Sequence, residues 1–134
     1  MSDYEPLEAH DLAASLTVRE LEQSAAWYQE ALGFTLDRKH ERNGKLIAIS
    51  LKAGTANLLL TQDDGAQGLE RSKGVGFSLQ LSTTQDADTL AARAKSYGAT
   101  LDTEPTTMPW GPRIFRLRDP DGFRWTISSK ARGA

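Results

Sequence analysis

The first half of the chain has a hydrophobic pattern that predicts a strand followed by a helix. The segment Ser15–Val18 predicts a short strand. Hydrophobic residues then recur at i, i+4, i+7 and i+11, the spacing of one helix face, at Leu21, Ala25, Tyr28 and Leu32. Gly33 follows directly and ends the helix, as expected of a C-terminal cap.

Three further strands are predicted before residue 62. They cover residues 34–36, 46–51 and 56–61. Asn43-Gly44 between polar flanks is a strong hairpin signal, and Gly54 marks a tight turn between the last two strands. The first half is therefore predicted to be β-α-β-β-β.

The second half repeats this order. A strand is predicted at residues 78–81, and Thr83 with Asp86 three residues later resembles a capping box. One helical face follows, ended by Gly98, and its members are Ala87, Leu90, Ala94 and Tyr97. The remaining strands are predicted at residues 99–102, 114–117 and 123–128, with residues 119–122 as a turn.

The two halves are offset by 63 residues at Ser15 and Ser78 and by 65 at Gly33 and Gly98. This near-constant offset favours an internal duplication, although two glycine-capped helices can also occur in an unrelated α+β protein. We predict an α+β fold: one domain of two β-α-β-β-β modules, about 13–62 and 76–129, joined by a polar linker at 63–75. Modules this small must pack together or pair across a dimer, giving a curved mixed sheet with helices outside and a cleft inside.

Composition excludes several classes of function. The chain has 134 residues, 16 basic and 18 acidic side chains and a formal net charge of -2, so no nucleic-acid-binding basic surface is expected. Its longest apolar runs, such as residues 58–60, are far too short for a membrane span, and a cytoplasmic location is the default expectation. There is no cysteine, and the two histidines, His10 and His40, exclude a three-histidine metal site within one chain.

Three stretches together resemble the vicinal oxygen chelate superfamily, which includes glyoxalase I, bleomycin-resistance proteins and extradiol dioxygenases. They are residues 16–24 with Trp27-Tyr28 and 32–34, residues 91–98, and residues 109–115 with 119–125. The last stretch is similar to the ending of the bleomycin-resistance-like branch. Their order and spacing imply the fold, whereas fold alone does not settle an activity.

The resemblance implies a divalent metal in the cleft, held by His, Glu or Gln at four positions. In this chain those positions correspond to Ala13, Leu58, Gly76 and Thr126, none of which is a good ligand. His10, in an acidic N-terminal segment, reaches such a site only if the register slides by three residues. His40, in a charged hairpin stem, is expected to be solvated. No metal and no cofactor are therefore predicted.

The candidate ligand-binding residues are Trp110, Arg116, Arg124 and Thr126. Alternation in the last strand places Arg124 and Thr126 on the face opposite Trp125, and Arg116 joins them from the preceding strand. Solvent exposure of this polar face is the equally weighted alternative. Trp110 precedes Gly111-Pro112 in a loop that is expected to border the cleft. The acidic residues of 63–64 and 119–121 are expected to be solvated.

These observations favour a metal-free small-molecule-binding protein, a homodimer that sequesters a drug or metabolite. The arginines make a cationic drug such as bleomycin a doubtful ligand. One alternative is a lyase, isomerase or dioxygenase-type enzyme of the same superfamily with atypical or absent metal ligands. Another is an interaction module without a small ligand.

Overall fold

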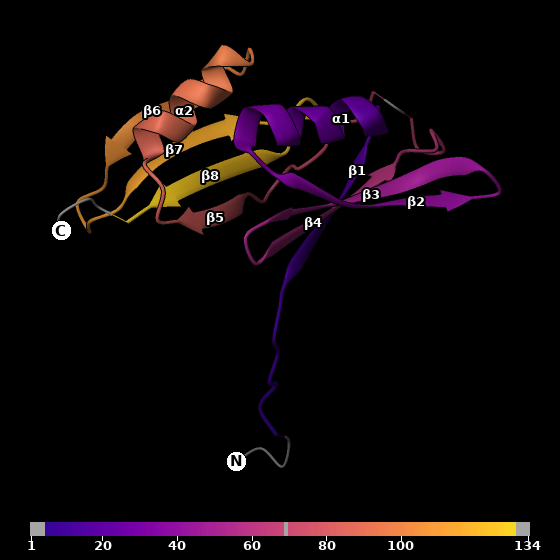
Figure 1. Cartoon of the computed structure of the whole chain (residues 1–134), viewed down its shortest axis with the longest axis horizontal. Coiled ribbons are helices and arrows are strands. Elements are labelled where there is room, and N and C mark those ends of the chain that lie inside the picture. The colour runs from indigo at the N-terminus through magenta and orange to yellow at the C-terminus, as the bar shows by residue number, and fades with distance from the viewer. Residues whose placement is uncertain (1–4, 69, 131–134) are drawn as a thin grey trace.

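The structure is a computed structural model that describes residues 5–68 and 70–130, and it contains two modules of one helix and four strands each (Figure 1). The first module comprises β1 (Ala13–Val18), α1 (Leu21–Trp27), β2 (Thr35–Arg42), β3 (Lys45–Ala53) and β4 (Ala56–Gln62). The second comprises β5 (Leu79–Thr83), α2 (Ala87–Ser96), β6 (Leu101–Thr107), β7 (Arg113–Arg118) and β8 (Arg124–Ser129).

The two sheets have the same topology. Their strand orders are β1-β4-β3-β2 and β5-β8-β7-β6, and in each the first strand is parallel to the last while the other pairs are antiparallel. The α+β fold with two β-α-β-β-β modules, predicted from the sequence, is confirmed.

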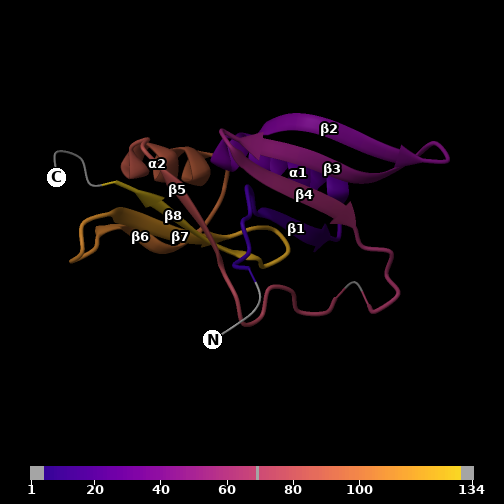
Figure 2. The same cartoon turned by 90° about the horizontal axis from the view of Figure 1, so that it is seen from below.

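Both helices lie on the same side of the sheets, and one continuous core separates them from the strands (Figure 1). In Figure 2 the segment that connects the modules loops away from both sheets between β4 and β5. The core-facing positions of the central strands are fully buried, and they are Ile49, Leu51, Leu58, Leu60, Phe115, Leu117 and Ile127. Each sheet thus buries one face and leaves the other, which we call its open face, without helices.

Helix α1 ends as the sequence predicts. It continues through a wider π-helical turn over Tyr28–Leu32, and Gly33 follows with a φ of +85°. The amide of Phe34 donates a hydrogen bond back to the carbonyl of Tyr28. The exposed Arg93 on α2 donates to the carbonyls of Gln29 and Glu30, so it joins the second helix to the end of the first.

Three local predictions differ from the structure. The strand predicted at 99–102 is β6, which begins at Leu101 and extends to Thr107 at the edge of the second sheet. Strand β2 extends to Arg42, well beyond Leu36, because it pairs with β3 at the sheet edge, where charged side chains remain in solvent. The N-cap of α2 is Asp86, whose carboxylate accepts from the amide of Thr89, whereas Thr83 bonds only the amide of Gln85. The helix therefore begins one turn later than a cap at Thr83 would give.

Three aspartates expected in solvent are buried instead. Asp63 forms ion pairs with Arg71 and Lys73 across the connecting segment. Asp119 and Asp121 lie in the turn before β8, where Asp121 accepts from the backbone and side chain of Arg19. Sequence cannot show this, because the partners of Asp121 are about a hundred residues away. Among the described helices, none has the length and apolar character needed to cross a membrane.

Tyr28 joins the two modules through a buried hydrogen-bond chain. Its hydroxyl donates to Asp119 Oδ2 at 2.6 Å and accepts from Trp125 Nε1 at 2.9 Å. Its ring also makes edge contacts with Phe34 and Trp125. The aromatic residues of the first helix and the aspartate of the turn before β8 are thus parts of one contact between the modules.

Burial raises the pKa of Tyr28 well above its ordinary value of 10.0, and the charge of Asp119 raises it further. In the unfolded chain this phenol loses its proton near pH 10, whereas in the folded chain it keeps it, so stability must fall as pH rises above that point. We expect Tyr28→Phe to flatten the alkaline limb of the stability profile. The free energy of unfolding in urea, determined between pH 8 and 11, measures this. If its dependence on pH is the same in Tyr28→Phe as in the natural chain, the burial of an un-ionised phenol is contradicted.

Candidate functional site

The open face of the second sheet carries three of the four predicted site residues. Trp125 and Ile127 of β8 face the helices, so Arg124 and Thr126 lie on the opposite face. Arg116 of β7 is directly opposite Thr126, and its Nε lies 3.3 Å from Thr126 Oγ1. The structure therefore brings Arg116, Arg124 and Thr126 together on one exposed surface.

This open face is positively charged. Arg118 lies directly opposite Arg124 on the neighbouring strand. Asp102 of β6 pairs with Arg118, with an Nε–Oδ2 distance of 3.1 Å. Within the described residues Arg116 and Arg124 have no carboxylate within ion-pairing distance. Two arginines on this face are consequently available to an anionic group.

Trp110 lies in the β6–β7 connection and not on a strand of this open face. It lies in the loop between Thr107 and Arg113, and its side chain is 75% exposed. A backbone bond between the amide of Met108 and the carbonyl of Pro112 closes this loop. Trp110 is thus presented to solvent at the end of the second sheet, and the structure places it against none of the other three candidates.

The side chains at the family's metal positions do not provide a donor set for a divalent ion. Ala13 is an exposed residue at the start of β1, and Gly76 lies in the loop before β5 with a φ of +88°. Leu58 is 2% exposed and faces the helices, so the sequence register for that position was wrong, and Asn57 and Leu59 face the open side. Across residues 5–68 and 70–130, no group of three or more His, Cys, Asp or Glu side chains is found.

His40 is a further candidate residue, whose surroundings the sequence reasoning did not predict. It was expected in solvent, but it is half-buried on the open face of the first sheet, with Nε2 2.8 Å from Ser50 Oγ. Arg38 lies opposite Ser50 on the adjacent strand. The alternating positions Arg38 and His40 in β2 could have indicated a shared face. The prediction ended the strand at Leu36, because the charged residues after it show no hydrophobic alternation.

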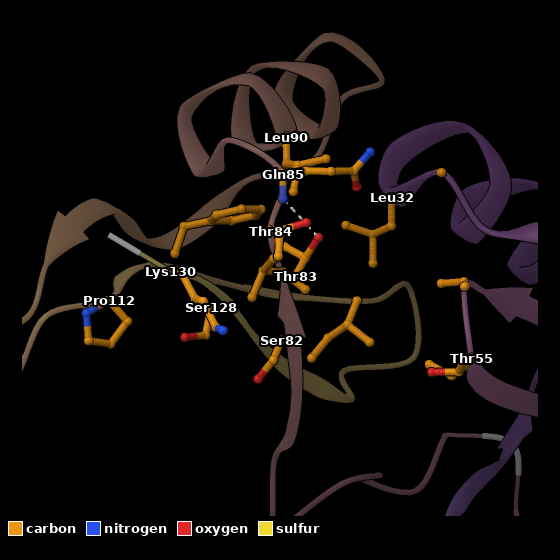
Figure 3. A pocket seen from close by; sticks show the side chains of 17 residues that line it. Leu32, Thr55, Ser82, Thr83, Thr84, Gln85, Leu90, Pro112, Ser128 and Lys130 are labelled. Atoms are coloured by element: carbon orange, nitrogen blue, oxygen red, sulfur yellow. Dashed lines mark hydrogen bonds between the residues drawn. The ribbon is translucent and has the colours of Figure 1, made fainter. Parts of the chain in front are cut away.

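A cavity of about 750 Å³ lies between the modules at the free edge of β5 (Figure 3). The end of α1, the β3–β4 turn, the segment from β5 to α2 and the ends of β7 and β8 surround it. None of Trp110, Arg116, Arg124 and Thr126 lines it. The cavity is therefore a separate feature from the predicted arginine-containing face.

The sequence profile of the glyoxalase/bleomycin resistance protein/dioxygenase superfamily matches residues 11–127. The chain belongs to this superfamily. The match spans both modules and agrees with the duplicated topology. No curated protein sequence matches the chain.

Several solved structures share the fold at low sequence identity. A glyoxalase/bleomycin resistance protein/dioxygenase domain from Frankia sp. EAN1pec is 23% identical, with a TM-score of 0.75 and 96% of each chain covered. TioX from Micromonospora sp. ML1 is 18% identical, with a TM-score of 0.71, covering 90% of this chain and 99% of that one. A glyoxalase I variant from Zea mays is 24% identical, with a TM-score of 0.74, covering 89% of this chain and 44% of that one. At these identities the likeness establishes the fold alone.

Proposed function

We propose that this protein binds a small, planar, anionic molecule on the open face of the second sheet, without a metal ion. The observation that carries the proposal is the pair Arg116 and Arg124, which flank Thr126 with no carboxylate partner in the described structure. Guanidinium groups recognise carboxylates by paired hydrogen bonds and stack on planar rings. Sequestration of a drug or metabolite is the role that such binding without chemistry would serve.

The pattern at the metal positions supports the metal-free part of the proposal. Alanine and glycine have no donor side chain, and the neutral hydroxyl of Thr126 is a poor ligand for divalent metals. A second candidate function is an enzyme of the same superfamily with atypical or absent metal ligands. The close approach of His40 to Ser50 favours it, because an imidazole beside a hydroxyl can move a proton.

Metal analysis of the purified protein separates these two functions. The expected result is far less than one equivalent of nickel, zinc, manganese or iron per chain after incubation with each ion and gel filtration. One tightly held equivalent would overturn the metal-free proposal and favour the enzyme.

Ligand titration tests the arginine-containing face. We expect 2-naphthoate to bind more tightly than the neutral 2-naphthamide by about fivefold, the contribution of an ion pair in solvent. The double variant Arg116→Gln/Arg124→Gln should lose this preference in isothermal titration calorimetry, whereas the exposed control Arg42→Gln should keep it. Equal binding of both probes by the natural chain, or an unaffected double variant, would contradict the proposal.

We further propose that the chain is one domain, works as a homodimer and is cytoplasmic. The dimer is supported by the open faces, because each sheet leaves one face without helices in the single chain. A second copy could cover these faces and narrow the surface into a cleft that surrounds a ligand. Sedimentation equilibrium tests this assembly.

A further inference from the structure

We propose that the cavity between the modules is a second binding site, which takes an aliphatic monocarboxylate: a single anionic head on a flexible hydrocarbon chain. This goes beyond the proposed function, since it concerns a different place and a different class of ligand. The inference stands on three observations among the described residues: partly exposed leucines, several hydroxyl groups, and one lysine without a carboxylate partner.

Three leucines from three different elements surround the cavity. Leu32 lies at the end of the first helix, Leu81 in β5 and Leu90 in α2, and each packs on the core but keeps part of its surface open. Fully buried Phe115 and Ile127 lie behind them. A cavity of this volume with an apolar lining has the size and character of a small-molecule site between two structural units.

The polar groups of the cavity are almost all neutral. They are the hydroxyls of Thr55, Ser82, Thr83, Thr84 and Ser128 and the amide of Gln85. The hydroxyl of Thr83 already accepts a hydrogen bond from the backbone amide of Gln85, drawn as a dashed line in Figure 3. These groups can accept and donate single hydrogen bonds, but they carry no charge that would select a cation or a dianion.

Among the described residues that line the cavity, Lys130 is the one with an ionisable side chain. Within the described residues no carboxylate lies within ion-pairing distance of its ammonium group. The nearest acidic surroundings belong to an adjoining hollow shared by Lys130, Asp86 and Asp88. There Asp88 is held by two bonds from Arg113, and Asp86 caps α2, so both carboxylates are engaged.

Lys130 and Leu32 lie on opposite sides of the cavity (Figure 3). In the view of Figure 3, Lys130 and Pro112 are on one side of the cavity, while Leu32 and Thr55 are on the other. A ligand with a carboxylate head and an aliphatic body would place its head at Lys130 and its body against Leu32, Leu81 and Leu90. One lysine pairs with one negative charge, which favours a monocarboxylate over a more highly charged ligand.

The probes are octanoate, 1-octanol and octylammonium, titrated into the natural chain by isothermal titration calorimetry. We expect octanoate to bind about fivefold more tightly than octanol, as an exposed ion pair allows, and octylammonium to bind least. Lys130→Met keeps most of the length of the side chain but removes its charge, and it should lower the affinity for octanoate to that for octanol. Lys45→Met, the same change at an exposed position of β3, should alter neither the affinity for octanoate nor the affinity for octanol.

A steric variant tests the apolar half. Thr55 lies on the exposed β3–β4 turn, outside the core. Thr55→Trp should narrow the cavity and so weaken the binding of octanoate and of octanol alike. Leu90→Trp should do the same from α2, and thermal unfolding shows whether it still folds. The inference is overturned if octanoate does not bind at millimolar concentration, if octanol binds equally well, or if Lys130→Met or Thr55→Trp changes nothing.

The outcome is separable from that of the proposed function. Arg116→Gln/Arg124→Gln should leave octanoate binding unchanged, because neither arginine lines the cavity. If this double variant abolishes octanoate binding while Lys130→Met does not, the carboxylate binds the open face instead. The second site would then be wrong and the proposed function would stand.

Discussion

Replacing Asp119 with alanine is expected to cost about 3 kcal/mol of folding free energy, because several buried donors lose their acceptor at once. Asp119 Oδ2 accepts from Tyr28, and Oδ1 accepts from the amides of Asp121 and Phe123. The alanine variant leaves these groups unpaired between the two modules. Urea unfolding followed by tryptophan fluorescence measures the loss.

Two comparison variants show whether the loss in Asp119→Ala comes from the buried hydrogen bonds. Asp102→Ala removes an exposed carboxylate that pairs with Arg118, and it should cost less than about 1 kcal/mol. Burial raises the pKa of Asp119, so its ionised carboxylate carries a desolvation cost at neutral pH. Asp119→Asn avoids that cost and keeps one acceptor oxygen. Its loss of folding free energy should therefore lie between those of Asp119→Ala and Asp102→Ala. Equal losses for Asp119→Ala and Asp102→Ala would contradict the buried network.

Replacing Gly33 with alanine is expected to cost about 2 kcal/mol through two separate effects, of which the backbone effect is the larger. The φ of +85° disfavours any residue with a Cβ by about 1 kcal/mol or more. The new Cβ would also lie 2.9 Å from Arg93 Nη1, which forces the guanidinium away from the carbonyls of Gln29 and Glu30. Thermal and urea unfolding both report this change.

Gly54 offers a matched control for the backbone effect. It has a φ of +60°, and a Cβ there would meet nothing within 4 Å, so Gly54→Ala should cost only about 1 kcal/mol. A double-mutant cycle with Arg93→Ala isolates the steric effect, because the clash disappears when the arginine is gone. If Gly33→Ala and Arg93→Ala are fully additive, the guanidinium does not lie over Gly33.

Local signals were sufficient for most of the architecture. The helix face that begins at Leu21, the glycine at 33 and the Asn43-Gly44 turn were all found, because each depends on residues near one another in sequence. Strand β2 was underestimated, because its charged residues have no hydrophobic alternation and the strand exists through its pairing with β3. A strand at a sheet edge is determined by its neighbour as much as by its own sequence.

The candidate site was predicted unevenly for the same reason. Alternation along β7 and β8 is local, so the shared face of Arg116, Arg124 and Thr126 could be predicted. The proximity of His40 to Ser50 depends on the register between two strands, and the cavity at Lys130 depends on how two modules pack. Neither has a local signature, and the binding role of any of these residues stays a prediction.

The sequence by itself determined the duplicated β-α-β-β-β order, the superfamily resemblance and the lack of good ligands at Ala13, Gly76 and Thr126, because these depend on residue identity and short-range spacing. Only the tertiary structure decided that Leu58 faces the core and that Asp63, Asp119 and Asp121 are buried. Burial is a property of what packs against a side chain, and for Asp119 that partner is Tyr28, in the other module.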